Sequence, residues 1–131
     1  MTRVRTVAAA PNTKSIEAQE TLSAAVLRAA GILKISQGDL GQILGISPAS
    51  ISRMSSGRYL LDPNGKEWQL AALFVRMFRS LDSISGGNDE VSRKWMHSEN
   101  RALHGIPADL LGEVGSFVRV VQYLDASRAM V

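Results

Sequence analysis

The sequence predicts an all-α protein, and three observations support this prediction. Apolar residues recur three and four positions apart along most of the chain, which is the spacing of one face of an α-helix. No segment alternates apolar and polar residues as a β-strand does. Clusters of glycine, asparagine and proline divide the chain into segments of helical length. We therefore expect a series of α-helices joined by short turns.

The composition limits the size and the chemistry of the protein. Its 131 residues, 45% of them hydrophobic, can bury one core or two small ones but are too few for an enzyme with a separate cofactor domain. The chain has no cysteine, which excludes disulfides and zinc sites made of thiolates. It also has no apolar run long enough to span a membrane and no core of a signal peptide. We expect a cytoplasmic protein.

The N-terminal part of the chain is expected to contain a basic arm followed by a helix. Residues 1–14 carry basic side chains but no periodic apolar face, which is typical of a mobile arm. Ser15 is placed to cap a helix that ends at Gly31. One side of this helix is apolar and consists of Ile16, Leu22, Ala25, Val26 and Ala29.

Residues 37–56 predict two short helices that pack against each other. Leu40 and Leu44 lie four positions apart on the first helix, and Ile51 and Met54 lie three apart on the second. These spacings place each pair on one face of its helix, where it can be buried. The two helices are therefore expected to share a small apolar core.

The turn between these two helices has a suitable residue at each special position. Gly41 has no side chain at the point where the helices would cross, and Gly45 can adopt positive φ at the end of the first helix. Ser36 and Ser47 are good N-cap residues, and Pro48 suits the first helical position because no N–H is needed there. The segment is therefore predicted to be a helix-turn-helix.

The outward face of the second helix is suited to DNA. It consists of small hydroxyl residues and arginine, and no acidic residue occurs between Ile43 and Leu61. The positive excess lies in the same part of the chain, since residues 1–60 hold seven Lys/Arg against three Asp/Glu while residues 61–131 hold eight against nine. A solvated helical corner is the alternative, and whether the basic arm also contacts DNA stays open. The predicted DNA-binding residues are Gln37, Ser47, Ala49, Ser50, Ser52, Arg53, Ser56 and Arg58.

A turn at residues 59–65 precedes a helix with a broad apolar face. The Asp-Pro and Asn-Gly pairs in this turn are strong turn signals. From about Lys66 to Ser83, apolar residues cover more than half of the helix circumference. One neighbouring helix cannot cover so broad an arc, so we expect a central core helix, a dimer interface or both. The residues predicted for the dimer interface are Trp68, Phe74, Met77, Phe78 and Leu81.

Two further helical segments follow. Asn88 is placed to cap a helix that runs to about His97. Residues 107–126 carry another apolar stripe at helical spacing, which Gly112 and Gly115 interrupt. This last segment is expected to be one kinked helix or two short ones.

No catalytic or metal-binding set of residues is recognisable. His97, Ser98 and Glu99 match the His-x-Glu of zinc deaminases, but that chemistry needs two further ligands, usually cysteines. The chain has no glycine-rich phosphate loop and no nucleophile beside a suitable base. We therefore expect no metal, no cofactor and no enzymatic activity.

The second half of the chain has a distinctive residue pattern. Arg93, Lys94 and Trp95 precede a segment, residues 98–126, in which a leucine and a glycine come before a proline and a glycine leads a final apolar helix. The residues of this pattern are Asn100, Leu103, Gly105, Pro107, Leu111, Gly115, Val118, Val121 and Leu124. Together with the helix-turn-helix, the pattern resembles the antitoxins of the Xre/MbcA/ParS group over about residues 36–126.

This resemblance implies an Xre-like helix-turn-helix followed by a small helical domain that binds a toxin and dimerises. It implies a protein that neutralises a cognate toxin, most often a RES-domain toxin that consumes NAD, and that represses its own operon. Residues 1–14, 15–62 and 63–131 would then be the basic arm, the DNA-binding domain and the toxin-binding and dimerisation domain. The predicted toxin-binding residues are Arg93, Trp95, Asn100, Arg101, His104, Ile106, Tyr123, Arg128, Met130 and Val131.

Two hypotheses about mechanism accompany this resemblance. The C-terminal segment ends in side chains small enough to enter a cleft, so we expect it to block the active site of the toxin. A homodimer would present two recognition helices about 34 Å apart to a palindromic operator. Two other functions stay open at this point: a stand-alone Xre-type repressor whose C-terminal domain dimerises or senses a ligand, and an interaction module whose helix-turn-helix has lost DNA binding.

Overall fold

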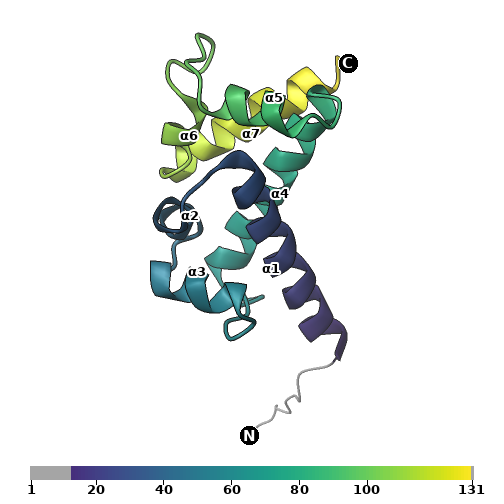
Figure 1. The fold of residues 1–131 in the computed structure, drawn as a ribbon, viewed down its shortest axis with the longest axis vertical. Coiled ribbons are helices and arrows are strands. Elements are labelled where there is room, and N and C mark those ends of the chain that lie inside the picture. The colour runs from purple at the N-terminus through teal and green to yellow at the C-terminus, as the bar shows by residue number, and fades with distance from the viewer. Residues whose placement is uncertain (1–12, 131) are drawn as a thin grey trace, which may run out of the picture.

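The computed structural model describes the backbone of residues 13–130 and the side chains of residues 16–130. Seven α-helices and no β-strand occur in this part of the chain, which confirms the all-α prediction. Figure 1 shows α4 running through the middle of the molecule, with α1, α2 and α3 towards one end and α5, α6 and α7 at the other. The helices are α1 (Thr13–Leu33), α2 (Gln37–Leu44), α3 (Pro48–Ser55), α4 (Lys66–Ile84), α5 (Asp89–Met96), α6 (Pro107–Leu110) and α7 (Val114–Arg128).

The predicted bounds of the first helix were wrong at both ends. Residues 1–12 of the predicted basic arm lie outside the described residues. Helix α1 begins at Thr13, before the predicted cap at Ser15, and continues through Gly31 to Leu33. It passes Gly31 because Leu33 is fully buried in the core, and this burial outweighs the low helix propensity of a single glycine. Lys34 ends the helix with a φ of 58°.

Helix α4 is the central helix, and it packs against α1, α2, α5 and α7. Its side chains Ala71, Phe74 and Met77 have no exposed surface. The Phe74 ring meets the Phe117 ring of α7 edge to face, with the centroids 6.5 Å apart. The chain itself therefore covers most of the broad apolar face of α4.

This packing corrects the predicted dimer interface. Phe74, Met77 and Leu81 are buried within one protomer, so their surfaces are not free to contact a second copy. The prediction was wrong for these three residues because a sequence shows the width of an apolar face but not how many helices cover it. Trp68 and Phe78 are only partly buried.

Residues 107–126 form parts of two separate helices, α6 and α7, and not one kinked helix. Helix α6 starts at Pro107 and is a single turn. Helix α7 starts after Glu113, whose Oε1 accepts hydrogen bonds from the N–H and the Oγ of Ser116 at 3.3 and 2.8 Å. Val114, which the apolar stripe included, is 59% exposed, because it lies in the first turn of α7 beside this cap.

A polar cluster fastens the far end of α7 to α4. The carboxylate of Asp125 accepts a hydrogen bond from the Oγ of Ser80 at 2.8 Å and pairs with the guanidinium of Arg76. Ser80 is completely buried, so this bond satisfies a hydroxyl that water cannot reach. The cluster holds the C-terminal helix in place on the central helix.

Candidate DNA and protein interfaces

The crossing of α2 and α3 depends on two glycines. A β-carbon built at Gly41 would lie 2.7 Å from the backbone oxygen of Ile46, so no side chain fits at this position. Gly45 ends α2 with a φ of 76°, in the left-handed region that favours glycine. Both residues have the roles that the sequence predicted.

The N-termini of the same two helices are capped by serines, again as predicted. The hydroxyl of Ser36 accepts a hydrogen bond from the N–H of Asp39 at 3.1 Å. The hydroxyl of Ser47 accepts one from the N–H of Ser50, also at 3.1 Å, and Pro48 occupies the first turn of α3. These caps fix where each helix starts and therefore which side chains face outward.

Helix α3 has one face in the core and one face in solvent. Ile51 and Met54 are buried, with 1% and 4% of their surfaces exposed. The opposite face is open to solvent, and so is Gln37 at the first position of α2. The exposed residues on or beside α3 that were predicted to bind DNA are Ser47, Ala49, Ser52, Arg53, Ser56 and Arg58.

Ser50 differs from the predicted outward position, because only 9% of its surface is exposed. Its Oγ lies 3.1 Å from the Oγ of Ser47 and accepts a hydrogen bond from the Nη2 of Arg53 at 3.3 Å. The expectation that Ser50 contacts DNA directly is therefore corrected. Its hydroxyl instead orients the guanidinium of Arg53, which lies one helical turn further along α3.

Arg58 lies just beyond the C-terminus of α3 and is also held by a serine. Its Nε donates to the Oγ of Ser56 at 3.0 Å, and that hydroxyl donates to the carbonyl of Arg53 at 3.0 Å. Gly57, with a φ of 77°, makes the turn between them. Two oriented guanidinium groups therefore lie at the same end of α3, in a stretch of chain without an acidic residue.

Tyr59 anchors the loop that follows. Its hydroxyl donates to the Oε2 of Glu67 at 2.6 Å, and the same oxygen accepts from the N–H of Asp62 at 2.9 Å. Partial burial, and then the hydrogen bond to Glu67, raise the pKa of Tyr59 to about 12. Tyr59 and the backbone of Asp62 therefore share one carboxylate oxygen of Glu67, which fastens the loop to the first turn of α4.

A second candidate surface lies on the C-terminal helices. The rings of Trp95 on α5 and Tyr123 on α7 stack with their centroids 6.3 Å apart and their planes 20° apart. Both side chains are half-buried, so each leaves part of its ring exposed. The sequence predicted both as toxin-binding residues but did not indicate that they touch.

The loop between α5 and α6 is closed by its own hydrogen bonds. Asn100 and Gly105 exchange backbone hydrogen bonds of 2.8 and 3.2 Å, and the Oδ1 of Asn100 accepts from the N–H of Leu103 at 3.1 Å. Leu103 is buried, whereas Arg101 and His104 are exposed at the tip. The loop therefore presents two predicted toxin-binding residues on a rigid support.

The remaining predicted toxin-binding residues belong to the end of the loop and to the C-terminal end of the chain. Ile106 is partly buried at the end of the loop. Arg128 is exposed at the end of α7, and Met130 is 89% exposed. Val131 lies outside the described residues.

Arg93 and His97, at the end of α5, contact the last turn of α1. Its Nε donates to the carbonyl oxygen of Ile32 at 3.0 Å, and the Nε2 of His97 lies 2.7 Å from the carbonyl oxygen of Leu33. These carbonyls belong to the last turn of α1, where a helix leaves its C=O groups without internal partners. These contacts fasten α5 to α1, and because Arg93 is only half-buried, its predicted contact with the toxin stays a prediction.

Residues 13–130 show neither a metal centre nor a membrane span. No group of three His, Asp or Glu side chains that could hold a metal ion occurs among the described residues. None of the helices in this range is long and apolar enough to cross a membrane.

The geometry defines a class of protein: a small helix-turn-helix protein whose exposed second helix is joined to a helical second domain. Comparison with known families agrees with both parts. A model of the antitoxin Xre-like helix-turn-helix domain matches residues 15–76, and a model of the antitoxin Xre/MbcA/ParS C-terminal toxin-binding domain matches residues 80–129. The chain therefore belongs to the Xre/MbcA/ParS antitoxin family, as its sequence pattern predicted.

A solved structure supports the same assignment. One chain in the crystal structure of the M. tuberculosis MbcT–MbcA toxin–antitoxin complex is 28% identical and superimposes with a TM-score of 0.60. The similarity covers 84% of this chain and 96% of that chain. No curated protein matches the sequence. The protein is thus an antitoxin with a helix-turn-helix domain and a toxin-binding domain.

Proposed function

We propose that this antitoxin neutralises a RES-domain toxin that consumes NAD and represses the operon that encodes the pair. The proposed DNA binding rests on one observation: helix α3 is exposed on one face, bears Arg53 there and has no acidic residue. The RES identity rests on the resemblance to Xre-type antitoxins. Pairing with a toxin is supported by the C-terminal toxin-binding domain and by the MbcT–MbcA complex, which is itself a toxin–antitoxin pair.

In this proposal the two arginines of the helix-turn-helix have different roles. Arg53, oriented by Ser50, would reach a base edge in the major groove. Arg58, held beyond the end of the helix, would bind a backbone phosphate, as would Gln37 at the N-terminus of α2. A homodimer would place two copies of α3 about 34 Å apart on a palindromic operator.

The toxin would bind to the C-terminal helices. The stacked Trp95 and Tyr123 offer apolar ring surface, and the closed loop offers Arg101 and His104 at its tip. The exposed C-terminal residues would then enter the active site of the toxin. We retain residues 15–62 and 63–131 as the proposed DNA-binding and toxin-binding parts.

Co-expression with the product of the neighbouring gene tests the proposal. That product alone should arrest growth and lower cellular NAD, and co-expression of this chain should restore both and yield a complex on purification. Arg101→Glu should weaken the complex, whereas Arg28→Glu, an exposed change on α1, should not. A stand-alone repressor would bind its operator but leave the toxicity of the neighbour unchanged, and this result would reject the antitoxin mechanism.

A further inference from the structure

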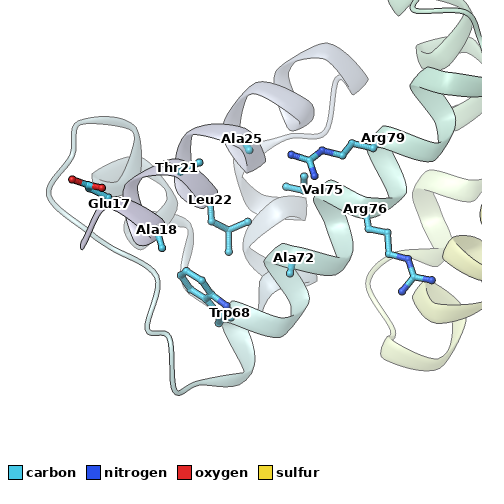
Figure 2. A pocket seen from close by; sticks show the side chains of 10 residues that line it. All are labelled: Glu17, Ala18, Thr21, Leu22, Ala25, Trp68, Ala72, Val75, Arg76 and Arg79. Carbon is cyan, nitrogen blue, oxygen red and sulfur yellow. The ribbon is translucent and has the colours of Figure 1, made fainter. Parts of the chain in front are cut away.

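Two surface hollows of about 470 Å³ each differ in the chemistry of their linings. The first is a groove between α1 and α4 with a mostly apolar lining, in which Figure 2 shows Leu22, Trp68 and Val75. The second lies between the turn that follows α1 and helix α5, and we call it the basic hollow. Its lining consists of Lys34, Glu90, Arg93, Lys94, His97 and Ser98.

The cations of the basic hollow are available to a ligand. Lys34 and Lys94 are exposed, and neither forms an ion pair within residues 16–130. Arg93 uses its Nε for the carbonyl oxygen of Ile32, while its two Nη groups donate to no atom of the same residues. Glu90 supplies the one carboxylate among the six lining residues and is not paired with these cations. The hollow therefore keeps an excess of positive charge, which suits an anionic ligand.

The backbone of Lys34 gives an independent indication that its side chain has a function. Its φ is 58° at the end of α1, a left-handed conformation in which helices usually place a glycine. The turn fixes this conformation, because the N–H of Lys34 donates to the carbonyl oxygen of Gly31 at 3.3 Å and the N–H of Ile35 to that of Ala30 at 2.9 Å. The turn alone would favour glycine, and a role of the ammonium group explains why a lysine stands here instead.

We propose that the basic hollow binds a backbone phosphate of the operator DNA, outside the helix-turn-helix. Lys34 lies three residues before Gln37, the first residue of α2, so their Cα atoms are at most about 11 Å apart. The hollow therefore continues the phosphate contact proposed at the N-terminus of α2, and Arg93 and Lys94 add helix α5 to it. The inference rests on the proposed DNA binding and extends it to the toxin-binding part of the chain.

The position of the hollow favours DNA over an acidic surface of the toxin. Residues 32–38 contain no acidic side chain, so a DNA strand that contacts Gln37 meets no negative charge between this residue and Lys34. The strained lysine belongs to the turn that leads into the helix-turn-helix and not to the C-terminal helices. Arg93 was predicted to contact the toxin, so the toxin is the competing occupant that the experiment has to separate from DNA.

Removal of single charges from the full-length protein tests the phosphate contact. Lys34→Gly removes the ammonium and relieves the backbone strain, so it should raise the Tm by a few degrees and yet weaken DNA binding by about three- to tenfold. Lys94→Ala should weaken DNA binding by a similar factor. Both variants should lose affinity for the operator and for a scrambled duplex alike, and each should reduce the salt slope by about 1. Arg28→Ala, an exposed change on α1 outside the hollow, removes the same charge and should leave affinity and slope unchanged.

Gel shifts over a salt series and co-purification with the product of the neighbouring gene give the readouts. Weaker binding to both duplexes in Lys34→Gly and Lys94→Ala, but not in Arg28→Ala, supports the proposal. Unchanged affinity and slope in both variants overturn it, and if Arg53→Ala still weakens operator binding, the proposed DNA binding through α3 stands without it. A wild-type protein that binds neither duplex removes both proposals. Loss of the toxin from Lys34→Gly with unchanged DNA binding shows that the toxin occupies the hollow, which also overturns the proposal.

Discussion

The Nε2 of His97 lies 2.7 Å from the carbonyl oxygen of Leu33, and this contact joins the C-terminal helices to the last turn of α1. Arg93, one turn earlier on α5, donates to the carbonyl oxygen of Ile32 at 3.0 Å. The chain passes from this turn of α1 almost directly into α2, the first helix of the helix-turn-helix. The two contacts therefore connect the toxin-binding helices to the start of the DNA-binding unit.

Replacement of His97 should measure the strength of this connection. His97→Ala removes the partner of a helix-terminal carbonyl and should lower the free energy of unfolding by about 0.5–1.5 kcal/mol. Lys94→Ala, on the exposed side of the same helix, should change it by less than about 0.5 kcal/mol. Urea denaturation of both variants makes the comparison. Equal effects would mean that the contact contributes nothing specific.

Two glycines of α2 provide a matched test of the helix crossing. Gly41→Ala would force its new β-carbon to within 2.7 Å of the backbone oxygen of Ile46, so it should cost about 1–3 kcal/mol and displace α3. Gly38→Ala meets nothing closer than 4.0 Å, so it should stabilise the helix by roughly 0.5–1 kcal/mol. The Tm and the affinity for the operator should both fall in Gly41→Ala, and neither should fall in Gly38→Ala. A stable Gly41→Ala protein that binds DNA normally would contradict the close approach.

The raised pKa of Tyr59 predicts a loss of stability at alkaline pH. The pKa rises from 10.0 to about 12 through partial burial and the hydrogen bond to Glu67, so folding favours the neutral phenol. This stabilisation is fully present below pH 10 and is lost as the pH rises towards 12. Ultraviolet titration of tyrosinate should show a phenol that ionises near 12 in the wild type and is missing from Tyr59→Phe. A wild-type curve without this late step would contradict the assignment.

The helix-turn-helix could be predicted from the sequence because its determinants are local. Gly41, Gly45, Ser47 and Pro48 lie within a few residues of one another, and each position restricts the backbone in its own way. The exposed side of α3 followed directly from this frame. Only Ser50 was wrongly predicted to face outward. Its hydroxyl accepts hydrogen bonds from Ser47 and Arg53 and is therefore used within the helix-turn-helix.

Contacts between distant segments could not be predicted in this way. Asp125 meets Arg76 and Ser80 across 49 and 45 residues, and Arg93 reaches Ile32 across 61 residues. No periodic pattern marks such partners in a single sequence. The same limit explains the error at the dimer interface, since the apolar width of α4 is visible in the sequence and the identity of its neighbours is not.

The two arginines of the helix-turn-helix should differ in how they affect DNA binding. Arg53→Ala should weaken operator binding by roughly 1–3 kcal/mol and relax the choice of one base pair. Arg58→Ala should weaken binding to all sequences and reduce the salt slope by about 1. Arg28→Ala, exposed on α1, is the control for net charge. Gel shifts with the operator and a scrambled duplex, each over a salt series, distinguish these outcomes. If neither substitution changes the affinity, DNA binding through α3 is refuted.

Whether the C-terminal segment blocks the active site of the toxin can be tested only with a truncation that leaves α7 intact. Truncation after Leu124 would remove Asp125 and leave the hydroxyl of Ser80 buried without its partner, so a loss of toxin binding could reflect misfolding. Helix α7 extends through Arg128. Truncation after Arg128 removes the exposed Met130 and its neighbours but keeps this polar cluster.

The chain that ends at Arg128 should remain folded, with its free energy of unfolding within about 0.5 kcal/mol of the wild type. If the tail fills the active site of the toxin, this shortened antitoxin should still bind the toxin through Trp95, Tyr123 and the loop, but the complex should consume NAD. NAD consumption by the purified complex, beside that of the full-length complex, gives the answer. Full inhibition by the shortened chain would show that the loop and the stacked rings, rather than the tail, block the toxin.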